Sequence, residues 1–166
     1  MRIGIALGSN LGDRLRNLQL ATAELRALPG VSHEMLRSKV YETEPVDCEP
    51  GSAPYLNAVV EIGYEGHPIM LLDALQGIEK KMGRPSKRPR NASRTIDLDI
   101  LYAGNLALAN DEIVIPHPRL HLRRFVLAPL HDIRPELILP GQHDPISTLL
   151  SRLPEKPAAS TFSEFP

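Results

Sequence analysis

Asp97 and Asp99 have the residue type and the spacing of a metal site. They alternate with apolar residues over 94–101, a pattern that predicts a β-strand with both carboxylates on one face. Alternate residues of a strand have Cα atoms roughly 6.6 Å apart, so the two carboxylates could share one or two hard divalent cations. Without a cation or a basic partner, each carboxylate would raise the pKa of the other. The pattern alone also fits an edge strand with two solvated aspartates, so the surrounding sequence must decide.

A dense run of positive charge leads into the aspartates, in a chain that is otherwise balanced. Cationic side chains beside a metal–carboxylate pair suit a polyphosphate, because the metal bridges phosphate oxygens while the cations bind the remaining charge. By itself the run also fits a solvated basic loop. Its members are Lys80, Lys81, Arg84, Lys87, Arg88, Arg90 and Arg94.

A histidine between two prolines follows the aspartates along the chain. His117 lies between Pro116 and Pro118, so its backbone is restricted, and its imidazole could hydrogen-bond a phosphate in the neutral or the protonated form. Arg123 could bind the same charge. Taken singly, both residues are also compatible with a structural or an exposed position.

A small set of strands and helices must position these side chains. Apolar residues alternate in four segments and recur at helical spacing in two others, and Gly83 fits the C-terminal cap of the second helix. The order β-α-β-β-α-β predicts an α+β fold of the ferredoxin-like (split βαβ) kind, with both helices on one face of an antiparallel sheet. The expected strands span 2–7, 35–43, 56–64 and 94–101, and the expected helices span 11–28 and 68–82.

The length of 166 residues suits one domain, expected over residues 1–156. Between Pro129 and Leu153, prolines predict short helical pieces packed as an additional layer. Residues 157–166 are small, polar and bounded by prolines, which predicts a flexible tail. The connections 44–54 and 84–94 are long for turns and suit binding loops.

The composition argues against several classes of partner. The net charge of −1 gives no reason to expect nucleic acid or a membrane surface. The single cysteine, Cys48, cannot form an intramolecular disulfide, no signal peptide is recognisable, and no apolar run approaches the roughly 20 residues of a membrane helix. We therefore expect a cytoplasmic monomer whose partners are small molecules.

Five motifs occur in order along the chain: Tyr41-x-Thr43, Tyr55-Leu56-Asn57, Gly83-Arg84, the run from Arg94 to Ile100, and Pro116-His117-x5-Arg123-x-Phe125. Together they resemble the 6-hydroxymethyl-7,8-dihydropterin pyrophosphokinase (2-amino-4-hydroxy-6-hydroxymethyldihydropteridine diphosphokinase) family of folate biosynthesis. The resemblance runs from Gly8-Ser9-Asn10 to about Pro140 with order and spacing kept, and that family's fold is also ferredoxin-like. It implies transfer of the diphosphoryl group of ATP to the hydroxymethyl group of the pterin, with release of AMP.

The resemblance also implies a role for each matching residue. Asp97 and Asp99 would bind two Mg²⁺ and, with Arg84 and Arg94, would form the catalytic group. Gln76 and Glu79 are expected on the exposed side of the second helix. The implied ATP-binding residues are Gln76, Glu79, Arg84, Arg94, His117 and Arg123, and the implied pterin-binding residues are Thr43, Val46, Tyr55, Asn57, Asp97 and Phe125.

The chain departs from the family pattern in the segment before Arg94. Asn91-Ala92-Ser93 stands where many members carry a tryptophan and a proline, and the chain has no tryptophan. A divergent protein of the same fold that binds ATP and Mg²⁺ without this activity is therefore the alternative. An RNA-binding module of this fold would need surface aromatics and would give the two aspartates no purpose. In a nucleotidyltransferase of the polymerase-β kind, Ser9 would stand far closer to Asp97 than it does.

Overall fold

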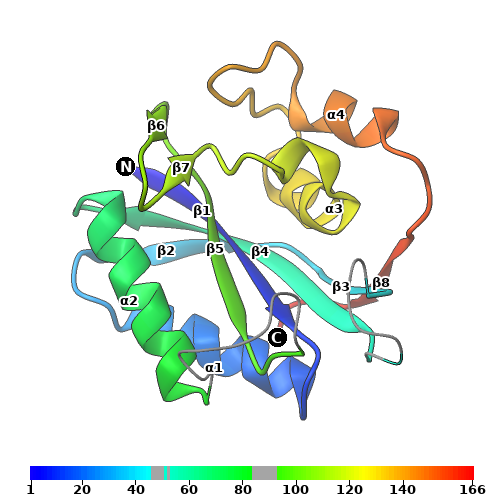
Figure 1. Cartoon of the computed structure of the whole chain (residues 1–166), viewed down its shortest axis with the longest axis horizontal. Coiled ribbons are helices and arrows are strands. Elements are labelled where there is room, and N and C mark those ends of the chain that lie inside the picture. Colours follow the sequence, from blue (N-terminus) through cyan, green and yellow to red (C-terminus); the bar gives the residue numbers. More distant parts are fainter. Residues whose placement is uncertain (46–50, 52, 84–92) are drawn as a thin grey trace.

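The computed structural model describes residues 1–45, 51, 53–83 and 93–166 of the chain. The helices of the described residues are α1 (Arg14–Arg26), α2 (Pro68–Lys81), α3 (Arg124–Ile133) and α4 (Ile146–Arg152), and a 3-10 turn, η1 (Leu120–Leu122), precedes α3 (Figure 1). The strands are β1 (Arg2–Ser9), β2 (Val31–Arg37), β3 (Val40–Thr43), β4 (Tyr55–Tyr64), β5 (Asp97–Ala103), β6 (Leu108–Ala109), β7 (Val114–Ile115) and β8 (Ala159–Ser163).

One antiparallel sheet organises the chain, in the order β5-β1-β4-β3-β8, with β2 also paired to β4. β6 and β7 form a separate small hairpin. The prediction of an α+β fold is confirmed. All four predicted strands and both predicted helices exist. The structure differs from the prediction in where these elements begin and end, and in one interruption that divides a predicted strand.

The interruption falls at Ser38, where one predicted strand is two. The Ser38 backbone N–H donates to Val59 O at 2.9 Å, and the Ser38 hydroxyl accepts the Val59 N–H at 2.9 Å. A side chain thus takes the place of a backbone group in the ladder, and β2 ends before β3 begins.

Helices cover both faces of the sheet (Figure 1). α1 and α2 pack against one face through alternate residues of β1, β4 and β5, and this is the larger core. α3 packs on the other face together with α4, around a smaller core. The fully buried members of the larger core include Ile3, Ile5, Leu18, Leu25, Val60, Ile62, Leu71 and Leu75.

Two expectations for the second half of the chain are wrong. Pro129 does not end a helix but lies inside α3, where it is buried. The ring's burial offsets the one backbone hydrogen bond that proline cannot donate. The expected flexible tail contains β8, which pairs with β3, and Phe165, whose side chain is buried in the larger core. Among the described residues, no helix has the length and apolarity needed to cross a membrane.

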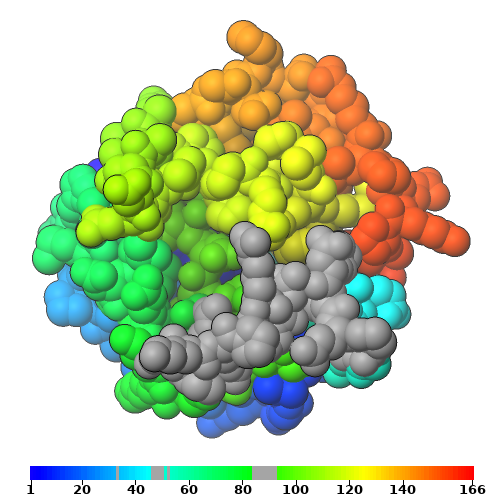
Figure 2. Space-filling view, viewed as in Figure 1, coloured from blue at the N-terminus to red at the C-terminus, as the bar shows by residue number. Residues whose placement is uncertain are grey.

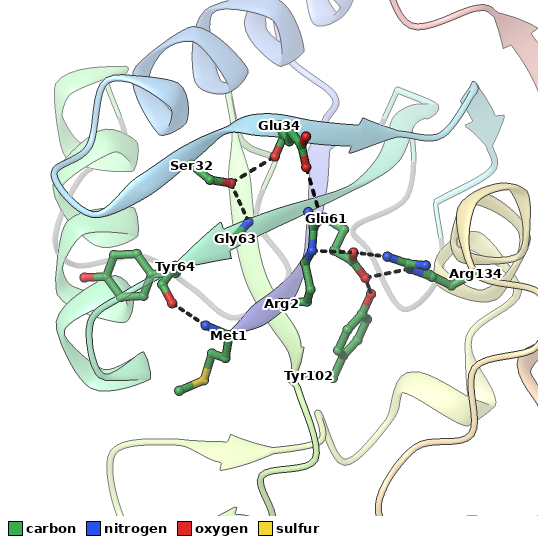
Figure 3. Close-up of polar contacts among 9 residues, drawn as sticks. All are labelled: Met1, Arg2, Ser32, Glu34, Glu61, Gly63, Tyr64, Tyr102 and Arg134. Carbon is green, nitrogen blue, oxygen red and sulfur yellow. Dashed lines mark hydrogen bonds and ion pairs between the residues drawn. The ribbon is translucent and has the colours of Figure 1, made fainter.

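A buried carboxylate links α3 to the sheet (Figure 3). Glu61 of β4 is 2% exposed and accepts hydrogen bonds from the Tyr102 hydroxyl at 2.5 Å and from Arg134 at 2.5 and 2.9 Å. Burial alone would raise the pKa of Glu61, but the bonds from Arg134 and Tyr102 outweigh it and the pKa is lowered. Arg134 caps the C-terminal end of α3, so this contact fixes that helix against β4 and β5.

Candidate active site

Strand β1, between β5 and β4, leaves space on the face of the sheet that α3 covers. Gly8 of β1 lies in register between Asn57 of β4 and Asp97 of β5, and the neighbouring Ala6 lies opposite Asp99. A Cβ atom at Gly8 would stand 3.1 Å from Asn57 Oδ1 and 4.0 Å from Asp97 Cβ. The row Asn57–Gly8–Asp97 therefore has polar groups on both sides and a backbone floor, which suits a flat ligand.

The two aspartates share one face of β5, as their spacing predicts. Leu98 and Ile100 belong to the core beneath α1 and α2, so Asp97 and Asp99 point to the opposite face, where both are half-buried. Arg94 Nη1 lies 2.6 Å from Asp97 Oδ2. Burial would lower the pKa of the Arg94 guanidinium, but the charge of Asp97 and its hydrogen bond raise it.

These carboxylates fit Mg²⁺ in the way that nucleotide-dependent enzymes use it. Mg²⁺ is usually held by one or two carboxylates, and phosphate oxygens and water complete its coordination. Among the described residues there is no cluster of three or more His, Cys, Asp and Glu side chains placed to bind a metal. A cation at Asp97 and Asp99 would therefore take its remaining ligands from a bound phosphate compound and water.

His117 is fixed beside β5 in a single tautomer. Its backbone N–H donates to Leu101 O at 2.8 Å, and its Nδ1 accepts the Arg119 N–H at 3.1 Å. Burial, with the charges of Arg123 and Arg119, lowers the pKa of His117 to about 4. The imidazole is thus neutral near pH 7 and carries its proton on Nε2, which makes it a hydrogen-bond donor.

Arg123 interacts electrostatically with His117 and with the two aspartates. Burial and the charge of Arg119 lower the pKa of Arg123, and the charges of Asp99 and Asp97 partly offset them. Its guanidinium carbon lies 5.4 Å from the centre of the Phe125 ring, within cation–π range. Both residues stand at the N-terminal end of α3, which presents them to the face that carries the aspartates.

Three residues that the resemblance assigns to the pterin lie together where β3 ends and β4 begins. Asn57 is buried, and its Nδ2 donates to Thr43 Oγ1 at 2.7 Å while its Oδ1 faces Gly8. Tyr55 pairs with Thr43 across the ladder, and its Cδ1 would lie 3.8 Å from a Cβ at Gly8. Thr43, Tyr55 and Asn57 are therefore brought together beside Asp97.

The two residues implied on α2 differ from each other. Gln76 is exposed, as expected. Glu79 is not, because it is 7% exposed and its Oε1 accepts the Leu98 N–H at 2.8 Å. Its carboxylate thus supports β5 at the residue between the two aspartates. Arg84 and Val46, and the variant segment before Ser93, lie outside the described residues.

A hollow opens on this face of the molecule (Figure 2). It lies between α2 and α3, and atoms in the colours of β5 and β1 are visible at its bottom. The hollow coincides with the strands that carry Asp97, Asp99 and Gly8.

The family comparison agrees with this geometry. The model of the 7,8-dihydro-6-hydroxymethylpterin-pyrophosphokinase family matches residues 4–135, which include every described site residue. This chain belongs to that family.

Individual proteins of similar sequence match most of the chain. The 2-amino-4-hydroxy-6-hydroxymethyldihydropteridine pyrophosphokinase of Haemophilus influenzae is 42% identical over 138 residues, which cover 82% of this chain and 84% of that protein. The enzyme of the same name from Bacillus subtilis is 43% identical over 129 residues, or 78% of this chain and 75% of that one. A solved structure, wild-type HPPK-DHPS of Plasmodium falciparum with SDX-DHP, shares the fold with a TM-score of 0.68 at 14% identity, over 91% of this chain and 44% of that chain.

The sequence did not single out three residues that lie beside the predicted site residues. Gly8 and Asn10 stand in the Gly-Ser-Asn motif, but glycine and asparagine after a strand first suggest a turn. Arg119 contributes charge beside His117 and Arg123, and its position two residues from His117 was the only available signal.

Proposed function

We propose that this chain transfers the diphosphoryl group of ATP to the hydroxymethyl oxygen of 6-hydroxymethyl-7,8-dihydropterin. The pyrophosphokinase activity on this pterin, a step of folate biosynthesis, follows from membership of the family and from the names of its similar proteins. The observation that carries the assignment of residues is the row Asn57–Gly8–Asp97. It puts a floor for a flat ring directly beside a carboxylate pair surrounded by Arg94, His117 and Arg123.

In the proposed reaction the pterin hydroxymethyl oxygen forms a bond to the β-phosphorus of ATP. The bond from that phosphorus to the oxygen bridging the α- and β-phosphates breaks, AMP leaves with that oxygen, and the hydroxyl proton passes to solvent. Arg94 and Arg123 bind phosphate oxygens, and neutral His117 donates a hydrogen bond from Nε2. Asp97 and Asp99 would hold two Mg²⁺, which supply charge neutralisation on the phosphates.

The pterin binds, in this proposal, with its ring over Gly8. Asn57 donates to and accepts from the amide edge of the ring, because Thr43 fixes the orientation of its side chain. Tyr55 and Phe125 enclose the ring by stacking. Holding both substrates against one rigid sheet supplies the reaction with proximity and orientation.

The remaining finer assignments are also proposals. The strand order β5-β1-β4-β2, antiparallel throughout, supports a ferredoxin-like core. ATP contacts at Gln76, Glu79 and Arg84, a pterin contact at Val46, the monomeric state and the cytoplasmic location stay predictions.

The test is release of AMP from ATP and Mg²⁺ with and without the pterin. The wild type should form AMP only when the pterin is present, and Asp97→Ala and Asp99→Ala should each remove it. Asp144→Ala is the matched control, because Asp144 pairs with Arg152 beside α4, and it should keep the activity. Formation of ADP, or no AMP from folded wild type that binds ATP, would instead favour the divergent nucleotide-binding protein.

A further inference from the structure

Asn10 is a buried polar residue that the reaction scheme does not use. It follows the last residue of β1, belongs to no helix or strand, and is only 2% exposed. Burying an amide is unfavourable unless its donors and acceptor are hydrogen-bonded. The partners of Asn10 therefore indicate why it is there.

Two of these bonds hold the backbone of Arg94. The Asn10 N–H donates to Arg94 O at 3.1 Å, and Asn10 Oδ1 accepts the Arg94 N–H at 2.7 Å. Both polar groups of the Arg94 backbone are thus bound by one residue, which is 84 positions away in the sequence. Arg94 precedes β5, so this contact extends the pairing of β1 and β5 beyond the end of the strand.

The remaining donors of the side chain bind the two chain segments that flank the site. Asn10 Nδ2 donates to Ser93 Oγ at 3.0 Å and to Ala53 O at 3.4 Å. Ala53 lies two residues before Tyr55, and the next carbonyl, Pro54 O, accepts from Arg14 at 2.9 Å. Asn10 therefore connects the segment that leads into Tyr55, on the proposed pterin side of the site, with the segment that leads into Arg94, on the proposed phosphate side.

We propose that Asn10 is a positioning residue that sets the place of the Arg94 guanidinium beside Asp97 and ties it to the segment that carries Tyr55. This inference rests on the proposed function, in which Arg94 binds phosphate. A guanidinium reaches its ligand from a fixed Cα, so a shift of the Arg94 backbone moves the charge away from the phosphate.

A double-mutant cycle between Asn10 and Arg94 tests the proposal. Asn10→Ala and Arg94→Ala should each lower kcat/KM for ATP, Asn10→Ala by roughly 10- to 100-fold. Because Asn10 acts through Arg94, the double variant should be no worse than Arg94→Ala alone. If the two losses multiply instead, Asn10 does not act through Arg94 and the proposal is wrong.

The control is another asparagine, Asn17 of α1, whose side chain bonds to the same turn. Asn17 Nδ2 donates to Ser9 Oγ at 3.2 Å and to Leu11 O at 2.9 Å, on both sides of Asn10. Asn17→Ala should leave kcat/KM within about twofold. An equal loss in Asn17→Ala and Asn10→Ala would assign the effect to the turn and overturn the proposal. If Asn10→Ala does not fold, the cycle is run with Asn10→Ser, whose shorter side chain stays polar but cannot take the place of Oδ1 on the Arg94 N–H.

A second readout does not depend on the activity. Amide hydrogen exchange measured by NMR should show the Arg94 N–H protected in the wild type and exchanging at least about tenfold faster in Asn10→Ala. The affinity for a non-hydrolysable ATP analogue with Mg²⁺ should fall in the same variant. These results would uphold the role of Asn10 even if the wild type released no AMP, whereas unchanged protection of Arg94 would overturn it.

Discussion

His117 is a neutral donor in the free protein, and this can be measured at one residue. Its NMR titration should have a midpoint near pH 4, well below the usual value of 6.5. Arg123→Ala should raise the midpoint, because it removes a neighbouring positive charge. The unfolded chain takes up this proton more readily, so the contribution of His117 to stability is complete above pH 6.5 and is lost as the pH falls toward 4. A midpoint near 6.5 would contradict the burial of the His117 side chain.

Gly8 sets the depth of the proposed pterin site. The added methyl group of Gly8→Ala would meet Asn57 Oδ1 at 3.1 Å, which is closer than most Cβ contacts in proteins. This close contact should weaken pterin binding by about 1.4 kcal/mol, which corresponds to a roughly tenfold rise in KM for the pterin. KM for ATP should change little. Gly77→Ala is the control, because a Cβ there meets nothing within 4 Å and alanine favours the helix. Equal effects on both substrates would place the pterin elsewhere.

The site residues differ in how far the sequence could predict them. Strand alternation was enough for Asp97 and Asp99, because their apolar neighbours define the opposite face. The predicted exposure of Glu79 was wrong although the apolar pattern of α2 indicates burial, since Glu79 follows the buried Leu75 by four residues and so shares its helix face. Asn10 could not be predicted, because its partners are brought together only by the fold.

At the level of whole elements, Glu61 is the group that fixes α3. Glu61→Gln should lower the free energy of unfolding at pH 7 by about 1–3 kcal/mol, because charged hydrogen bonds to Arg134 are lost. The pKa of Glu61 is lowered in the folded protein, so its contribution exists above the usual value of 4.5 and is lost as the pH falls below it.

Urea unfolding at pH 7 and at pH 4 measures this difference. The wild type should lose more stability than Glu61→Gln between the two pH values. Glu34→Gln is the matched control, because Glu34 is 85% exposed, pairs with Arg2 at 3.3 Å, and should change the stability by less than about 1 kcal/mol. The same loss in both variants would show that the burial of Glu61 is not what matters.

Elements with a strong apolar period were predictable, and those defined by distant contacts were not. The period gave α1, α2, β1, β4 and β5 within a few residues. The break at Ser38 depends on a side chain bonding to β4, and β8 depends on pairing with β3, more than a hundred residues earlier in the sequence. α3 continues through Pro129, whose burial inside the helix the proline pattern did not reveal.

For the whole molecule, both ends of the described chain are fixed to the sheet. The Met1 ammonium donates to Tyr64 O at 2.6 Å, and Phe165 is 9% exposed within the larger core. Phe165→Ala should therefore lower the free energy of unfolding by about 3 kcal/mol, the usual lower value for a core phenylalanine. Phe162→Ala, at 47% exposure, is the control and should cost much less. Thermal and urea unfolding of both variants decide this, and equal costs would exclude a core role for the C-terminal segment.

The contact between the Tyr102 ring and Gly4, on the face of the sheet that α3 covers, suggests what an inhibitor should look like. Two rows from Gly8, the ring of Tyr102 lies so close to Gly4 that a Cβ there would stand 2.2 Å from Cε1, and Glu61 lies on the other side of Gly4. The chain thus already stacks one flat ring of its own on a β1 glycine, and Arg134 closes that arrangement (Figure 3). A synthetic ligand aimed at Gly8 should copy this ring: planar, with polar groups only at its edge, and with no substituent on the side that rests on β1.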